Sequence, residues 1–127
     1  MRKMIVRHRM YIQETIATVI AEERFFPVAE REVCIQRKNL HEYIQRQPKF
    51  LTSLTPCQPL PGAPEIVTDM IDRASRVGVG PMAGVAGAIA EYAVRAIVEE
   101  GATHVLFDNG GDIAMFIDRP VVVGVYA

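Results

Sequence analysis

The residues best suited to binding chemistry lie between Gly78 and Asp112. This stretch is predicted to form a glycine-rich loop at Gly78–Pro81, a helix of small residues ending near Glu100, a strand at His104–Asp108 and a glycine turn at Asn109–Gly111. Pro81 suits a first helical position, because the N–H that it lacks would have no partner there. Gly101 is a typical helix stop.

A short connection makes the predicted strand run antiparallel to the predicted helix, so the strand ends near the helix start. The two glycine turns would then lie on one side of the domain. Free N–H groups at a helix start favour a phosphate or a carboxylate. Twenty helical residues span roughly 30 Å and six strand residues roughly 20 Å, so twist or a later helix start must absorb the difference.

The glycines also have structural explanations. Gly84 and Gly87 inside a helix cost about 1 kcal/mol each relative to alanine, so either tight packing or a ligand is needed to explain them. Asn109-Gly110 is a common hairpin turn, and Asp112 could cap that turn or reach a ligand. The segment GVGPMAG has neither the GxGxxG spacing nor the Lys-Ser/Thr of a P-loop. No Ser-His-Asp or Cys-His arrangement is supported by spacing alone.

The composition favours a single domain without nucleic-acid or membrane partners. The chain has 127 residues, 50% of them hydrophobic, and a net charge of −1. The basic residues Arg2, Lys3, Arg7 and Arg9 are expected to be scattered along a solvated strand. Cys34 and Cys57 are expected to be free thiols. We find no signal peptide and no apolar run approaching the length of a membrane span, so we predict a cytoplasmic protein.

The segments before the glycine loop alternate between strand and helix signals. We predict strands at 4–9 and 10–21, with Glu14-Thr15 as a surface patch, and a helix from Pro27 to Gln47 with an exposed or capping His41. A further helical turn is expected to pack Phe50, Leu51 and Leu54 on the core. A proline-rich connector then leads to a helix over 64–77.

The segment after Asp112 resembles a hairpin. Ile113, Met115 and Ile117 alternate in a strand, Asp118–Pro120 form a turn, and Val121–Tyr126 form a second, strongly apolar strand. We expect this fold to be incomplete at its C-terminus, with the 127 residues forming the N-terminal part of a longer single domain. An exposed apolar edge invites pairing, so a second polypeptide or a symmetric partner is expected to cover Val121–Tyr126.

Two segments carry a family resemblance. Val79–Glu91, with the sequence VGPMAGVAGAIAE, and Asp108–Ile113, with DNGGDI, resemble the ApbE-related proteins, a cytoplasmic branch of the FAD:protein FMN transferase superfamily. The upstream residues Tyr43-Ile44, Pro48, Phe50, Pro64, Met70 and Gly78 fit the same pattern. The resemblance implies an α+β fold with a mostly antiparallel sheet and packed helices.

The same resemblance implies FAD or FMN as ligand, with Mg²⁺. Superfamily transferases carry a lysine where this chain has Ala86, and their later magnesium segment has no counterpart here, so transferase activity is an open question. The alternatives are an accessory protein of anaerobic sulfur assimilation toward homocysteine and a structural assembly role. The predicted ligand-binding residues are Gly78, Gly80, Pro81, Met82, Ala83, Gly84, Asn109, Gly110, Gly111 and Asp112.

Overall fold

A computed structural model describes residues 4–121 of the chain. Within that range the elements are β1 (Ile5–Ile12), β2 (Thr15–Glu22), α1 (Phe26–Arg46), α2 (Lys49–Thr52), α3 (Glu65–Val77), α4 (Val85–Glu99), β3 (Val105–Asn109) and β4 (Asp112–Phe116), with 3-10 turns η1 (Glu23–Phe25) and η2 (Pro81–Gly84). The predicted second strand of the last hairpin, Val121–Tyr126, lies almost wholly outside the described residues, as do Arg2 and Lys3.

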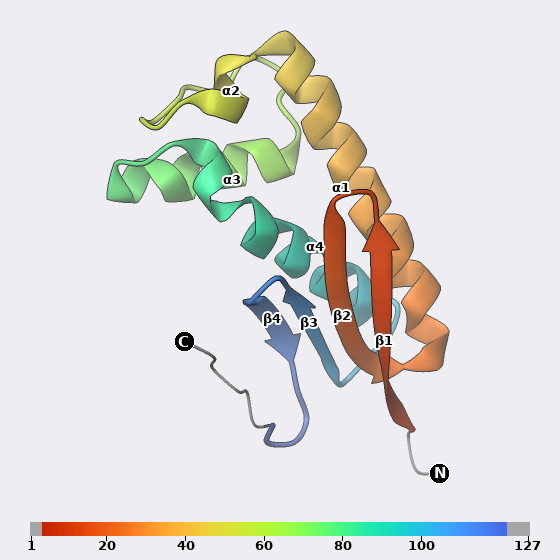
Figure 1. Ribbon diagram of the computed structural model, residues 1–127. Helices are drawn as coiled ribbons and strands as arrows, with labels where there is room; N and C mark the ends of the chain where they lie inside the picture. The colour runs from red at the N-terminus through yellow and green to blue at the C-terminus, as the bar shows by residue number, and fades with distance from the viewer. Residues whose placement is uncertain (1–3, 122–127) are drawn as a thin grey trace.

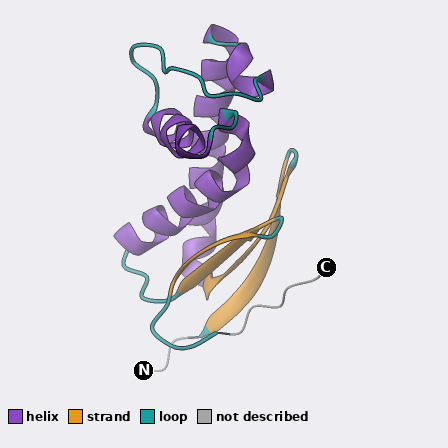
Figure 2. Cartoon of the chain, turned by 90° about the vertical axis from the view of Figure 1, so that its left-hand side faces the viewer, coloured by secondary structure: helices purple, strands orange, loops and turns teal. Residues whose placement is uncertain are grey.

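The strands form one four-stranded antiparallel sheet in the order β1-β2-β3-β4. Helices α1 and α4 lie against one face of this sheet, and α2 and α3 gather at the far end of α1 (Figures 1 and 2). The prediction of an α+β fold with an antiparallel sheet and packed helices is confirmed.

The two N-terminal strands break at a different place from the one predicted. The turn is Gln13-Glu14, and Gln13 has φ +51°, a left-handed conformation that ends the strand. Ala17, Val19 and Ala21 are buried on the helix-facing side of β2. The small alanines allow the helices to approach the sheet closely. The segment 10–21 contains no glycine or proline that would mark the break.

The long helix α1 matches its predicted span. Ala29, Val33 and Leu40 are buried on one face, and His41 is exposed as expected. The following turn matches its prediction only in part. Phe50 is fully buried, but Leu51 and Leu54 are 50% and 87% exposed, because a four-residue helix can direct few side chains inward.

Helix α4 lies at the centre of the fold. It contacts α1, α3 and both C-terminal strands. By length and composition the helical stretch Pro81–Glu99 could cross a membrane, contrary to the expectation that no apolar run approaches that length, yet 44% of its most apolar 18-residue window is buried inside this fold. Of the two cysteines, Cys34 is exposed and Cys57 is buried, and both are free thiols as predicted.

The β3–β4 hairpin closes with glycine at both loop positions. Gly110 and Gly111 have φ +62° and +99°, and the flanking Asn109 and Asp112 pair across the strands. The predicted turn is therefore displaced by one residue, with Asn109 ending the strand. Two residues with positive φ match the twist of a hairpin, and glycine adopts them without strain.

We expect Gly110→Val to destabilise the protein by about 1–3 kcal/mol, because a β-branched residue is a genuine outlier at positive φ. Gly110→Asn is the matched control, since asparagine tolerates this conformation. Urea unfolding followed by circular dichroism measures both. Equal loss of stability in the two variants would contradict the assignment of the effect to backbone conformation.

Candidate functional site

The second glycine turn is held against the start of α4. The side-chain amide of Asn109 donates a hydrogen bond to the Ala86 carbonyl at 3.1 Å, and Asn109 is buried. A Cβ built on Gly87 would lie 3.7 Å from Oδ1 of Asp112, so the two residues are neighbours. The strand therefore returns to the first turn of α4, at Ala86 and Gly87, and not to the predicted helix start at Pro81. The later helix start, at Val85 after the 3-10 turn η2, helps to absorb the difference in length.

The first glycine loop does not adjoin the second. Gly78 caps α3 with φ +74°, and its N–H donates to the Ser75 carbonyl at 3.3 Å. Gly80 is buried against the backbone of Ser53 and Leu54, where a side chain has no room. These glycines therefore serve a helix end and a close backbone contact, and η2 separates them from Gly110 and Gly111.

Four further predicted site residues, Pro81 to Gly84, divide between the core and an apolar groove. Pro81 is buried, and Met82 packs against the core. Ala83 and Gly84 lie on an apolar groove of about 230 Å³ between α3 and the start of α4. That groove also contains Arg73, whose Nη1 lies 2.6 Å from Oε2 of Glu91.

Charged side chains beside this groove tie α3 to α4. Hydrogen bonding from Arg73 lowers the pKa of the Glu91 carboxyl. Burial raises the pKa of the Tyr92 phenol, and its hydrogen bond to Asp69 raises it further. These groups are satisfied by one another, so we assign them to helix packing and not to chemistry.

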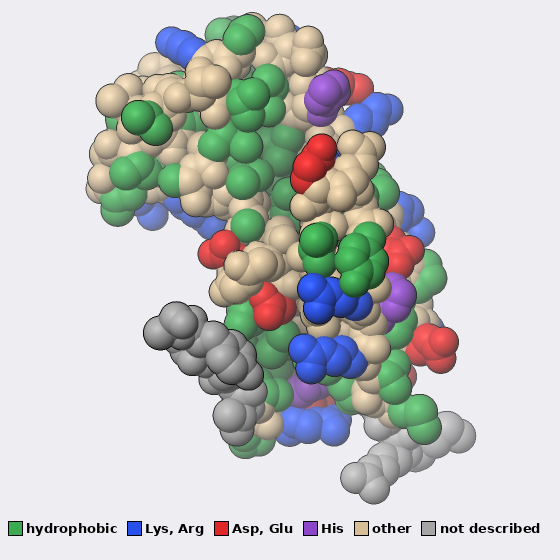
Figure 3. Space-filling view, in the orientation of Figure 1, with side chains coloured by type: hydrophobic (Ala, Val, Ile, Leu, Met, Phe, Trp, Pro, Cys, Tyr) green, Lys and Arg blue, Asp and Glu red, His purple; other side chains and the backbone are tan. Residues whose placement is uncertain are grey.

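The open face of the sheet carries a polar hollow next to the second glycine turn. Its volume is about 340 Å³, and it is lined by Arg7, Arg9, Ile16, Thr18, Asp108, Gly110 and Gly111. Strand pairing brings these residues together, because Arg9 faces Thr18 on β2 and Thr18 faces Asp108 on β3. Figure 3 shows basic side chains following one another on this face of the molecule.

Arg7 and Arg9 lie two residues apart on β1, so both point to the same face of the sheet. The expectation that alternation would scatter the basic residues is wrong for this pair, and the spacing of two was the signal that could have revealed it. Within residues 4–121 the ion pairs involve other side chains and include neither arginine.

The hollow suits an oxyanion. Two guanidinium groups can donate charge-assisted hydrogen bonds to phosphate oxygens, and Thr18 offers a hydroxyl. Asp108 carries the opposite charge, but its Oδ1 accepts a hydrogen bond from the Gly111 N–H at 2.9 Å, which orders the turn. In the described part of the chain no group of three or more His, Cys, Asp or Glu side chains could hold a metal ion.

These features define a small α+β protein with helices on one sheet face and a cationic hollow on the other. The chain belongs to the family described as AbpE bacteria, whose model matches residues 8–127.

The chain is also similar to several archaeal proteins that bear the name UPF0280 protein. The protein from Methanococcoides burtonii is 40% identical over 123 residues, covering 96% of this chain and 52% of its own length. The one from Methanocella arvoryzae is 47% identical over 116 residues, covering 91% and 47%. The one from Methanospirillum hungatei is 45% identical over 125 residues, covering 98% and 51%. The chain thus spans about half the length of these relatives.

These matches correct the family assignment made from the sequence. The resemblance to the ApbE-related branch of the FAD:protein FMN transferases is wrong: the matching family is AbpE bacteria, and the relatives carry only the name UPF0280 protein. The segments VGPMAGVAGAIAE and DNGGDI were misleading because glycines that serve packing and turns resemble glycines that serve a ligand. Ala86 is consequently an ordinary helix residue whose carbonyl accepts from Asn109.

Proposed function

We propose that this protein binds a phosphorylated ligand of the nucleotide class in the hollow between Arg7, Arg9 and the Gly110-Gly111 turn. The observation that carries the proposal is the placement of two arginines without carboxylate partners in residues 4–121 beside a glycine turn. Guanidinium donors that converge on one hollow are typical of phosphate sites. A volume of about 340 Å³ is at the small end of ligand pockets, which suits a nucleotide held mainly through its phosphates.

The cofactors expected from the sequence enter this proposal as probes. ADP, FMN and FAD all carry phosphate, and the hollow offers donors for that group. Mg²⁺ is usually bound by one or two carboxylates together with substrate phosphates, so Asp108 is the carboxylate available at the hollow, whereas Asp112 lies next to Gly87 of α4.

Titration of the purified chain with ADP, FMN, FAD and inorganic phosphate by calorimetry tests the proposal. Arg9→Met should weaken binding of the tightest of these ligands about tenfold or more, because a hydrogen bond to a charged group contributes about 1.5–3 kcal/mol. The folded protein should keep its stability within about 0.5 kcal/mol, since Arg9 is exposed.

Arg31→Met is the matched control, because Arg31 is an exposed arginine on α1 outside the hollow. Asp112→Asn adds a second comparison. A loss of ligand affinity seen only when Mg²⁺ is present would place Asp112 in the site. An unchanged ligand affinity would exclude Asp112 from the site. No saturable binding of any of the four ligands, or equal losses for Arg9→Met and Arg31→Met, would contradict the proposal.

The alternatives predicted from the sequence, an accessory role in sulfur assimilation or elsewhere and an assembly role, stay predictions. Tyr11 and Ile16 pair across β1 and β2 and are 69% and 47% exposed. A protein partner would contact these two side chains. The cytoplasmic location and the single longer domain likewise stay predictions.

A further inference from the structure

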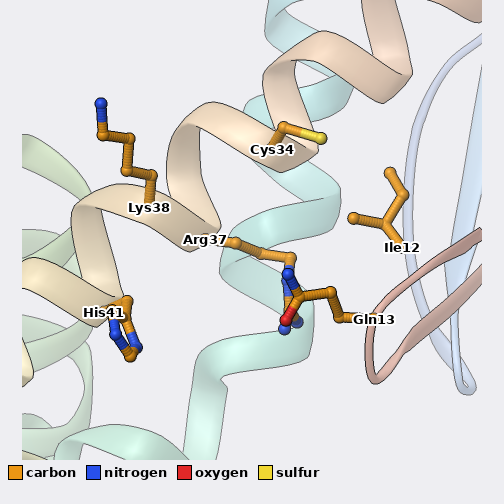
Figure 4. A pocket seen from close by; sticks show the side chains of 6 residues that line it. All are labelled: Ile12, Gln13, Cys34, Arg37, Lys38 and His41. Atoms are coloured by element: carbon orange, nitrogen blue, oxygen red, sulfur yellow. The ribbon is translucent and has the colours of Figure 1, made fainter.

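A second hollow, unrelated to the glycine turns, follows one face of α1. It consists of two adjoining spaces of about 320 and 490 Å³ that share Arg37 and His41. The first space lies between α1 and the β1–β2 turn, and the second continues between α1, α2 and the start of α4. Figure 4 shows Arg37 directed toward Gln13 of the turn, with Lys38 and His41 along the same helix.

One end of this α1 groove is apolar. Its walls come from four separate elements, and the side chains are Leu40, Ile44, Leu51, Met82, Val85 and Ile89. Leu51 is 50% exposed although it lies beside this wall, so the surface is open to an apolar ligand. Removing such surface from water contributes roughly 25 cal/mol per Å².

The other end holds Arg37 and Lys38, each paired with a carboxylate. Arg37 donates hydrogen bonds to Glu14 Oε2 at 2.5 Å and to Thr15 Oγ1 at 2.7 Å, and Lys38 lies 4.0 Å from Glu42. The Glu14 side chain is 83% exposed at the hairpin tip, so this carboxylate can leave Arg37 without a burial penalty. Arg37 therefore already holds a carboxylate at the mouth of an apolar space.

We propose that the α1 groove binds a small amphipathic anion, an aliphatic chain that ends in a carboxylate. The chain would lie along Leu40, Leu51 and Met82. The carboxylate would lie at Arg37 in exchange for that of Glu14. The charge complementarity at one end and the apolar wall at the other specify this ligand over a nucleotide.

Decanoate and decyltrimethylammonium below their micelle concentrations, and decan-1-ol below its solubility limit, test the proposal by calorimetry on the whole chain. Decanoate should bind saturably at one site. Decan-1-ol should bind about five- to tenfold more weakly, because it lacks a charge for Arg37, and the ammonium compound should bind least. Equal binding of all three would overturn the proposal, since it would show hydrophobic adsorption alone.

Two pairs of variants place the site. Leu51→Glu should weaken decanoate binding at least about tenfold, whereas Leu54→Glu should leave it unchanged, because Leu54 is more exposed and lies outside the groove. Arg37→Met should weaken binding about fivefold, with exposed Arg31→Met, outside the groove on the same helix, as its control. Circular dichroism confirms the fold of each variant.

Arg9→Met separates this site from the proposed nucleotide site. It should leave decanoate binding unchanged, because Arg9 belongs to the hollow on the open sheet face. The assignment to the α1 groove would be overturned if each variant and its control weakened decanoate binding equally. It would also be overturned if Arg9→Met abolished decanoate binding.

Discussion

Gly80→Ala is expected to destabilise the protein by about 3 kcal/mol or more, the largest effect of any glycine-to-alanine substitution within residues 4–121. A Cβ at position 80 would overlap the Ser53 carbonyl oxygen, and it would lie 2.8 Å from the Ser53 carbonyl carbon and 3.2 Å from the Leu54 Cα. All three atoms belong to backbone, which cannot rotate away as a side chain can. The loop after α2 must therefore shift, and forced shifts of packed backbone are among the costliest consequences of a single substitution.

Gly84→Ala and Gly87→Ala are the matched controls for this prediction. A Cβ at Gly84 meets nothing within 4 Å, and one at Gly87 makes only ordinary contacts with Asp112. Gly87→Ala should even gain up to about 1 kcal/mol, because alanine favours a helix interior over glycine. Urea unfolding followed at 222 nm measures all three, and a stability of Gly80→Ala close to that of Gly84→Ala would contradict the packing explanation.

Phe50→Ala is expected to cost about 3–5 kcal/mol, because it removes a fully buried aromatic side chain and leaves a cavity. The ring of Phe50 meets that of Tyr43 edge to face, with centroids 5.2 Å apart and planes at 78°. The Tyr43 hydroxyl accepts the Leu60 N–H at 2.9 Å, so this aromatic pair also anchors the proline-rich connector. Loss of Phe50 should therefore loosen α2 and the connector together.

Leu51→Ala, one position along the same helical turn, is the control. Half of that side chain is exposed, so its truncation should cost about 1 kcal/mol or less. Thermal and urea unfolding compare the two variants. Equal costs would mean that α2 is not anchored through Phe50, and faster amide exchange in the connector of Phe50→Ala alone would support the predicted coupling.

Local patterns in the sequence were sufficient for most of the secondary structure. The apolar stripe of α3, from Ile66 to Ala74, and the stop at Gly78 were both predictable, because helix periodicity and a left-handed cap depend on residues within a turn or two of each other. The glycines of the β3–β4 turn were predictable for the same reason. The break at Gln13-Glu14 was not, since no glycine or proline marks it.

The roles of the site residues depended on contacts between distant segments. The sequence determined that Gly80 and Gly110 lie in turns, but only the tertiary structure placed the backbone of Ser53 against Gly80 and left Gly110 open beside Arg9. Arg37 likewise lies within the predicted helix Pro27–Gln47, but only the folded chain brings Glu14 and Thr15 to its side chain. The physical reason is that propensity and periodicity act between near neighbours in the chain, whereas strand pairing and helix packing join residues that no local pattern relates.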